Sequence, residues 1–396
     1  MPTLRQAVER QREAASLPLQ GPITGRALNG QFSAQGGGSV RRLLAAMDVS
    51  QDKPWAVILC RFQGAAADPA VEAPIEALYR GMFAPVLGSV VEYWRDASLG
   101  AVRVGASQVF GWLTVAIARS QAGGSSLTSP PGPGRAGLTD LAIAALADTG
   151  EDTTRFVGYI AVYTENWSEP GHTQKGDWAS WAPFWIDGSA SGKKVTMTPT
   201  HAGDIVVHEM GHGFGMQHDR SPDLSVDYAD PCCTMSQRPL FFEPRFGVNF
   251  GPGICVTHLL LQGWMYRHRT FTDPGQWMNL SEGISLPLAA TNDPAARANL
   301  AIVLRNERAA PAYDYHLEYA RPIGWNRALA GDQVFVRRVA PDESSIATAI
   351  ILGSIMVPAD PAQTSSFVER EGNVLFEARR FDPDGRRVRV TATLLS

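Results

Sequence analysis

The chain of 396 residues is long enough for two or three domains, each with its own hydrophobic core. Its 44% hydrophobic residues, 19% charged residues and formal net charge of -4 are typical of a soluble globular protein and exclude a disordered or fibrous one. Lysine and arginine form no basic stripe with aromatic residues, so nucleic acid is not an expected partner. No apolar run approaches the about 20 residues of a membrane-spanning helix, so we expect no membrane span.

Residues 1–52 are predicted to form a separate helical N-terminal segment. Amphipathic spacing indicates short helices over about residues 3–16 and near 39–47. The opening sequence MPTLRQAVERQREAA is charged and polar where a signal peptide carries an apolar segment, so we expect that a signal has been removed or that none exists. The segment is a candidate inhibitory prosegment. It contains no cysteine that could cap a metal ion.

Residues 53–270 are predicted to form a domain in which strands and helices alternate. Apolar runs rich in strand-forming residues are WAVILCRF, AVRVGASQVFGWLTVAIA and FVGYIAVYTE. Helical spacing is found around residues 71–96 and in LTDLAIAALADTG. Residues 123–134, GGSSLTSPPGPG, are predicted to form an exposed loop because glycine and proline disfavour helices and central strands. This alternation is an α/β order.

Residues 271–396 are predicted to form an antiparallel β-sandwich. Turn residues separate short strand-like runs at regular spacing, namely AIVLRN, YHLEYA, QVFVRRV, ATAIILGSIMV, VLFEARRF and RVRVTATLL. We therefore expect an α+β fold, in which an α/β-ordered domain precedes an all-β domain.

The sequence GDIVVHEMGHGFGMQHD contains the pattern HExxHxxGxxH. Residues four apart on a helix project from one face about 5–6 Å apart, so His208 and His212 can bind one metal ion. Glu209 follows His208 directly and lies beside the metal, where it can hold a water molecule and take its proton. The full pattern is far rarer by chance than HExxH alone, so purely structural histidines are disfavoured.

The third histidine, His218, can reach the same ion only if the chain turns after His212. Gly213 and Gly215 permit the positive φ values that such a turn requires. Three protein ligands leave a fourth position for water, which is typical of a catalytic zinc site.

The motif resembles the signature of the metzincins, zinc peptidases in which HExxHxxGxxH is followed by a Met-turn. Met235 in PCCTMS is the Met-turn candidate, an apolar floor beneath the metal in that family; without the resemblance it would be interpreted as core filler. The chain is most similar to the immune inhibitor A and gametolysin group. This similarity covers about residues 55–340, through the segments SVVEYWRDASLGAVRV, DYADPCCTM, ICVTHLLLQGWM and YHLEYARPIGWNRALAGDQVFVRRV.

The resemblance implies a zinc-dependent endopeptidase with a protein or peptide substrate. His208, His212 and His218 would hold Zn²⁺, and Glu209 would be the general base toward the activated water. The family also implies an extracellular location and, as an option, bound Ca²⁺, for which the sequence has no EF-hand loop.

The chain departs from the family after the Met-turn. Several metzincins place a tyrosine two residues after the methionine to stabilise the oxyanion, whereas this chain has Gln237. Tyr228 is a candidate for that role, although a structural role for it is favoured. Asp219 either orients a group of the site or caps a turn, and the second interpretation is favoured.

Other residues near the motif have structural interpretations that are preferred to functional ones. Four tryptophans could line a cleft or stack on a sugar, but packing is favoured; they are Trp167, Trp178, Trp181 and Trp185. His172 and His201 lack ligand spacing and are interpreted as surface or loop histidines.

The four cysteines are few for this length. Cys60 lies in an apolar run and is predicted to be a buried small hydrophobe. Cys232 and Cys233 are adjacent, which excludes a C-x-x-C motif there. Cys255 could form a disulfide with either in an oxidising compartment, and this question stays open.

Two other functions stay open. A catalytically silent binding module for proteins or glycoproteins is disfavoured because such proteins usually lose the glutamate or a ligand, and all four are present here. A zinc amidase with a non-protein substrate is disfavoured because the third histidine after a glycine is the metzincin arrangement. The sequence does not determine the natural substrate, the cleavage-site preference or the oligomeric state.

Overall fold

The computed structural model describes residues 52–122, 134–163, 194–197, 203–236, 239–309, 311–341 and 347–395. Several predictions concern residues outside these ranges: the segment before Asp52, the loop before Gly134, Gln237, His172 and His201. The four tryptophans between residues 167 and 185 also lie outside the described residues.

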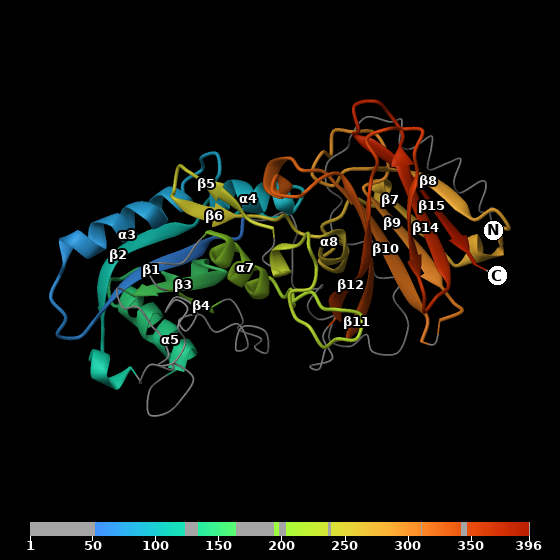
Figure 1. Ribbon diagram of the computed structural model, residues 1–396. Helices are drawn as coiled ribbons and strands as arrows, with labels where there is room; N and C mark the ends of the chain where they lie inside the picture. The colour runs from blue at the N-terminus through green and yellow to red at the C-terminus, as the bar shows by residue number, and fades with distance from the viewer. Residues whose placement is uncertain are drawn as a thin grey trace.

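A four-stranded sheet in which all neighbouring strands are parallel forms the N-terminal half, in the order β2-β1-β3-β4. Its strands are β1 (Trp55–Phe62), β2 (Gln108–Val115), β3 (Gly158–Tyr163) and β4 (Lys194–Met197). Alternate residues of a strand point to opposite faces. Val57 and Leu59 accordingly lie in a core shared with α3, α4 and α7, whereas Ile58 and Cys60 lie in a second core with α5. Figure 1 shows this layered arrangement.

The longer helices of the described residues are α3 (Pro69–Met82), α4 (Val90–Ala97), α5 (Gly134–Ala147), α7 (Gly203–Gly213) and α8 (Val256–Leu261). Short 3-10 turns are η2 (Arg119–Gln121), η3 (Thr153–Arg155), η5 (Thr234–Ser236), η6 (Arg267–Arg269), η7 (Gln276–Asn279) and η8 (Gly324–Asn326).

The prediction of one helical segment over residues 71–96 is wrong, because two helices occupy this stretch. Gly88 adopts φ +78° between them, a value that no right-handed helix contains. Ser89 then caps α4, and its hydroxyl accepts a hydrogen bond of 3.1 Å from the backbone N–H of Glu92.

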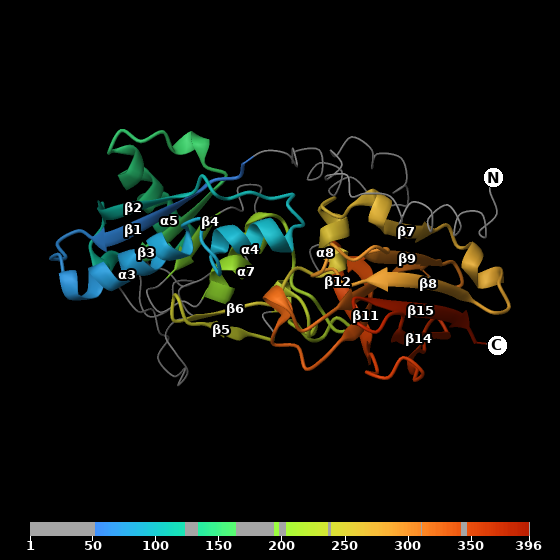
Figure 2. The same ribbon diagram turned by 90° about the horizontal axis from the view of Figure 1, so that it is seen from above.

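Two packed sheets form the C-terminal half, in the orders β12-β11-β10-β9-β7 and β13-β14-β15-β8 (Figure 2). Leu304, Leu317, Phe376 and Val390 lie in the core between them. The strands are β7 (Thr270–Asp273), β8 (Ile284–Ala289), β9 (Ala301–Asn306), β10 (Tyr313–Ala320), β11 (Gln333–Pro341), β12 (Ala347–Met356), β13 (Ser365–Glu369), β14 (Val374–Arg380) and β15 (Arg387–Leu394).

Each predicted strand run of this half overlaps an observed strand. All neighbouring pairs are antiparallel except β7 and β9, which are parallel. A small hairpin of β5 (Phe241–Glu243) and β6 (Val248–Phe250) lies beside α7. The chain thus mixes helices and sheets and has a β-rich C-terminal region, as the predicted α+β class requires.

A buried ion-pair network joins the two halves. The guanidinium of Arg337, on β11, binds both carboxylate oxygens of Asp230, in the loop after α7. It also donates a 2.6 Å hydrogen bond to Glu318, on β10. Glu318 in turn accepts a 3.0 Å bond from the backbone N–H of Val256, the first residue of α8. The loop and α8 are therefore both tied to the first sheet of the C-terminal half.

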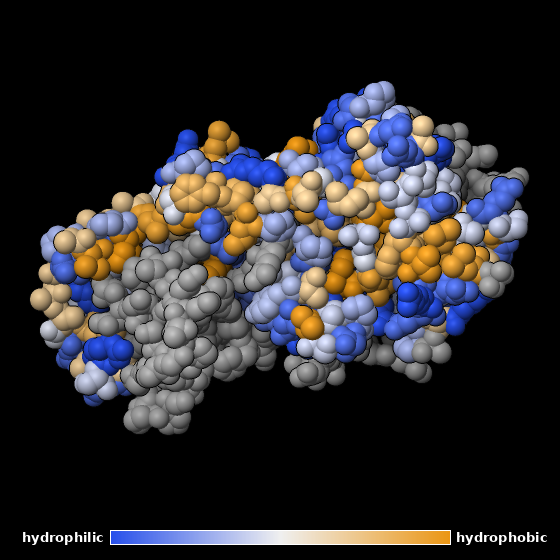
Figure 3. Space-filling model, in the orientation of Figure 1, coloured by the Kyte–Doolittle hydropathy of each residue, from blue (hydrophilic) through white to orange (hydrophobic). Residues whose placement is uncertain are grey.

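Hydrophobic and hydrophilic residues are interspersed on the face of the molecule in Figure 3. Leu87, Phe242 and Phe381 are among the exposed large hydrophobic side chains, and they come from separate elements. Within the described ranges, no helix combines the length and the apolar character needed to cross a bilayer.

Replacing Arg337 with methionine should lower the free energy of unfolding by about 3–5 kcal/mol, because Asp230 and Glu318 would stay buried without their cation. Urea denaturation followed by fluorescence measures the change. Arg95→Met is the control, since the Arg95 side chain is 59% exposed and its ion pairs should contribute less than about 1 kcal/mol. Equal, small changes in both variants would contradict a stabilising role for the network.

Candidate metal centre

Helix α7 carries the first part of the motif and is buried along its whole length. Two glycines allow this close packing. A Cβ on Gly203 would lie 2.5 Å from the ring of Phe250, and a Cβ on Gly211 would lie 2.6 Å from the sulfur of Met235. Side chains at these positions would push the helix away from its neighbours.

The helix ends in a Schellman motif. The N–H of Met216 bonds to the carbonyl of Gly211 at 3.0 Å, and the N–H of Gly215 bonds to that of His212 at 2.8 Å. Gly215 has φ +90°, as predicted for the turn, whereas Gly213 is still helical, so the expectation of a positive φ there is wrong. One glycine is enough because only the C′ residue of this motif is left-handed.

The three motif histidines come together. Nε2 of His212 lies 3.1 Å from Nε2 of His208 and 3.0 Å from Nε2 of His218. Tetrahedral coordination at 2.0–2.1 Å would separate two nitrogen ligands by about 3.3 Å. These two separations are within a few tenths of an ångström of the spacing that one ion requires, and the three histidines could bind a metal ion.

Backbone carbonyls orient two of the rings. Nδ1 of His208 donates to the carbonyl of Thr234 at 2.8 Å, and Nδ1 of His212 donates to that of Met216 at 2.9 Å. A carbonyl only accepts, so the proton is on Nδ1 and each Nε2 presents a lone pair. Burial lowers the pKa of His208 well below its usual value, and the neighbouring histidines lower it further. Both effects favour the neutral imidazole that a metal needs.

The third histidine is held by the C-terminal half. The hydroxyl of Thr348, on β12, donates to the backbone carbonyl of His218. Two residues on, Arg220 pairs with β12 through a 3.0 Å bond from its N–H to Ala349 and a 3.1 Å bond from Ile351 to its carbonyl. The chain after α7 thus follows the edge of the β-sandwich, and this contact sets the position of the third candidate ligand.

Glu209 and Tyr228 are the other polar side chains predicted for the site. Glu209 is fully buried on α7. The hydroxyl of Tyr228 lies 3.2 Å from Nε2 of His218, and the two ring centroids are 4.3 Å apart. Tyr228 also has φ +61°, which is uncommon for an aromatic residue and is found mainly where surrounding structure enforces it. These contacts show that Tyr228 lies beside the third histidine, while its role stays a prediction.

Met235 lies against the helix between the first two histidines. Its side chain is fully buried and contacts α7 at Gly211. The preceding residue, Thr234, provides the carbonyl that orients His208. The turn is therefore part of the support of the histidine cluster, while its assignment as a Met-turn stays a prediction.

Asp219 binds other buried side chains behind the histidines. Its carboxylate accepts a 2.8 Å hydrogen bond from Nε2 of His258 and a 3.3 Å bond from the hydroxyl of Ser236. It therefore orients His258 and Ser236, neither of which is a residue predicted for the site. His258 was missed because no other histidine has ligand spacing to it; the signal that could have found it is Cys255, three residues earlier at the start of the same helix.

All four cysteines are buried free thiols. Cys60 lies in the sheet core, as its prediction as a small hydrophobe requires. Cys232, Cys233 and Cys255 form no disulfide in this structure. Cys233 and Cys255 instead lie beside Asp219 and His258.

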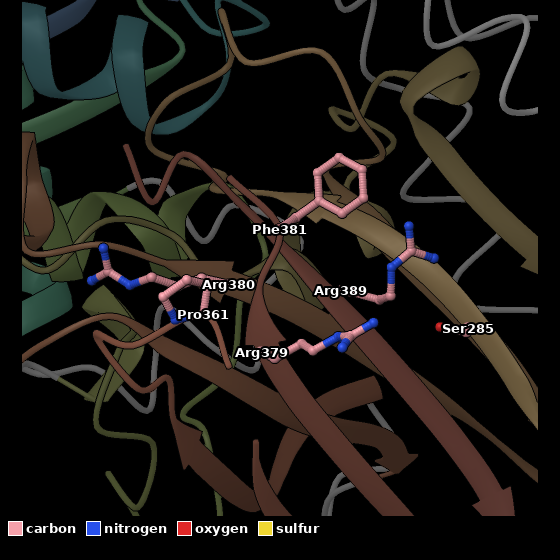
Figure 4. A pocket seen from close by; sticks show the side chains of 6 residues that line it. All are labelled: Ser285, Pro361, Arg379, Arg380, Phe381 and Arg389. Atoms are coloured by element: carbon pink, nitrogen blue, oxygen red, sulfur yellow. The ribbon is translucent and has the colours of Figure 1, made fainter. Parts of the chain in front are cut away.

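A hollow on the second sheet of the β-sandwich is separate from the histidines. It is lined by Ser285, Pro361, Arg379, Arg380, Phe381 and Arg389 (Figure 4). Arg380 pairs with Asp332 at 2.8 Å, and Arg389 lies 4.8 Å from the ring centroid of Phe381. These side chains thus interact with one another and with the surrounding surface.

No family model matches this chain, and no curated protein is significantly similar to it. The assignment to the metzincins therefore rests on the residues quoted above and stays a prediction.

The pH dependence of stability should depend on Asp204, one turn before His208. Burial raises the pKa of this carboxyl to about 7, against its ordinary value of 3.8. The stability contributed by its neutral form is present below pH 3.8 and is lost as the pH rises to about 7. We expect Asp204→Asn to unfold like the parent at pH 4 and to be more stable by up to about 4 kcal/mol at pH 8.

Urea denaturation of the Asp204→Asn variant and the parent across this pH range measures the difference. Asp148→Asn, at an exposed position after α5, is the control and should differ little from the parent at any pH. If the free energies of unfolding of Asp204→Asn and the parent differed by the same amount at every pH, the carboxyl would be ionised in the folded protein, and the prediction would be wrong.

Proposed function

We propose that the protein is a zinc-dependent endopeptidase of the metzincin type, with a protein or peptide substrate. The observation that carries the proposal is the convergence of three histidine Nε2 atoms, those of His208, His212 and His218, next to the buried Glu209. A structural histidine cluster would not need a carboxylate at this position.

The donor set favours zinc. Imidazole nitrogen is a preferred ligand of Zn²⁺, and three protein ligands leave one position for water or substrate. His208 and His212 have the proton on Nδ1, so the nitrogens that face each other carry lone pairs. When bound, the ion would polarise the scissile carbonyl and increase the acidity of the attacking water.

Glu209 is the proposed general base. Its carboxylate would take a proton from the attacking water and later donate it to the amide nitrogen that leaves. Because the carboxylate is buried on the rigid helix α7, it can hold one position throughout the reaction.

Tyr228 is proposed to stabilise the oxyanion. In several metzincins a tyrosine two residues after the Met-turn methionine has this role, whereas this chain has Gln237 at that position. The hydroxyl of Tyr228 is close to His218, and a phenolic O–H is a donor that can bind a developing negative charge. The strained backbone at this residue is consistent with a side chain held in place for function.

Glu209→Gln should abolish hydrolysis of a generic protein substrate while the purified protein keeps its zinc, because the amide has nearly the same shape but cannot take a proton. His212→Ala should lose both the metal and the activity. Metal analysis by mass spectrometry and a fluorescent casein assay, with and without a chelator, measure these outcomes.

Glu282→Gln is the matched control, since Glu282 is exposed in the turn before β8. Cleavage by Glu209→Gln at the parental rate would refute the general-base role. A parent protein that holds zinc but cleaves no protein or peptide would instead favour the binding module.

Tyr228→Phe should lower kcat by about 10²-fold, as the loss of an oxyanion donor does, with little change in KM or zinc content. A purely structural tyrosine would change stability and leave kcat of the folded enzyme near the parental value. Steady-state kinetics on a peptide substrate, together with thermal unfolding, separates the two roles.

A further inference from the structure

A second group of metal-binding side chains lies directly behind the histidine cluster. Asp219, Cys233, Cys255 and His258 each offer one ligand atom, and these four atoms lie within 4.8 Å of one another. All four residues are at most 1% exposed. They come from the chain after α7, the residue before η5 and the start of α8. Cys255 and His258 are three residues apart, and only the tertiary structure brings Asp219 and Cys233 to them.

The spacing of these atoms suits one tetrahedral ion. Bonds of about 2.3 Å to sulfur and 2.0–2.2 Å to nitrogen or oxygen separate ligand atoms by about 3.3–3.8 Å. Nε2 of His258 is 2.8 Å from Oδ1 of Asp219, so these two atoms would have to separate by only about half an ångström. All four ligand atoms lie within 4.8 Å of one another, so shifts of about an ångström or less would bring the rest of the group to this spacing.

The chemistry of the set points to a thiophilic divalent cation. Two thiolates, one imidazole and one carboxylate are the ligand types that zinc takes in closed, four-coordinate structural sites. A thiol pair in an apolar core needs no carboxylate and histidine beside it. A hydrogen-bonded Asp219–His258 pair, for its part, needs no thiols.

We propose that Asp219, Cys233, Cys255 and His258 form a second, structural zinc site. On binding, Zn²⁺ replaces the two thiol protons, which pass to solvent; the proton on Nε2 of His258 moves to Nδ1, so that Nε2 presents its lone pair, and no redox change occurs. The site has four protein ligands and no open position, so it would not be catalytic.

The position of the group gives the second ion a specific role. Asp219 follows His218, and Cys233 precedes Thr234, whose carbonyl orients His208. One ion would therefore join the backbone of the third histidine, the turn that orients the first, and α8. It would hold the histidine cluster in shape without contact with substrate.

Metal content and cobalt spectroscopy of the full chain test this proposal. Protein purified under reducing conditions with zinc should contain two zinc ions per chain. After replacement by Co²⁺ it should show thiolate-to-cobalt charge-transfer absorption, which the histidine cluster cannot produce because it has no sulfur ligand. His212→Ala should keep this absorption and retain one metal ion.

Cys233→Ser should lose the thiolate absorption and one metal ion. Cys232→Ser is the control, because Cys232 is equally buried and adjacent in sequence but is outside the ligand group. It should keep two ions and the absorption.

One metal ion per chain with no thiolate absorption would overturn the proposal, even if Cys233→Ser does not fold. A Cys233–Cys255 disulfide, found by peptide mapping of protein isolated without reductant, would overturn it as well. The proposal is independent of the proposed peptidase. Thiolate absorption in a protein without peptidase activity would support the second site and reject only the function.

Discussion

The packing of the two halves of the molecule depends on how the buried charge of Arg337 is neutralised. Its guanidinium lies in the interior, where an unpaired cation would cost several kcal/mol, and only Asp230 and Glu318 pair with it there among the described residues. Asp230 belongs to the loop that leads from the last motif histidine to Met235. Glu318 also binds the first N–H of α8. A single buried cation therefore decides how the loop and α8 pack on the first sheet of the β-sandwich, and it restricts them to one geometry.

Because of the same contact, residues of both halves of the chain position the histidine cluster. His208 and His212 are placed by α7, which packs on the parallel sheet. His218 is placed by a segment that extends along β12, where Thr348 binds its carbonyl. A division of the chain at residue 270 would cut through the core of α7, which includes Leu300 and Ala349, and through the support of the candidate ligands.

Layers of buried polar groups support the cluster from behind. Carbonyls of Thr234 and Met216 orient two imidazoles, and behind them Asp219 binds His258 and Ser236. Polar networks in a medium of low dielectric are costly unless every member is paired, so they favour one arrangement strongly over others. Such a network is a means of holding the three histidine side chains in one arrangement, whether or not a second ion is part of it.

The sequence by itself determined what depends on neighbours along the chain. Helical periodicity brought His208 and His212 to one face, Gly215 ended the helix, and alternating apolar runs marked the strands. The helix break before Ser89 was missed, although Pro85 and Gly88 precede it in the sequence. The tertiary structure alone decided the rest. Asp230 and Arg337 are 107 positions apart, and Asp219 and His258 are 39 apart. Over such separations no periodicity acts, and only the packing of whole elements determines which polar side chains meet.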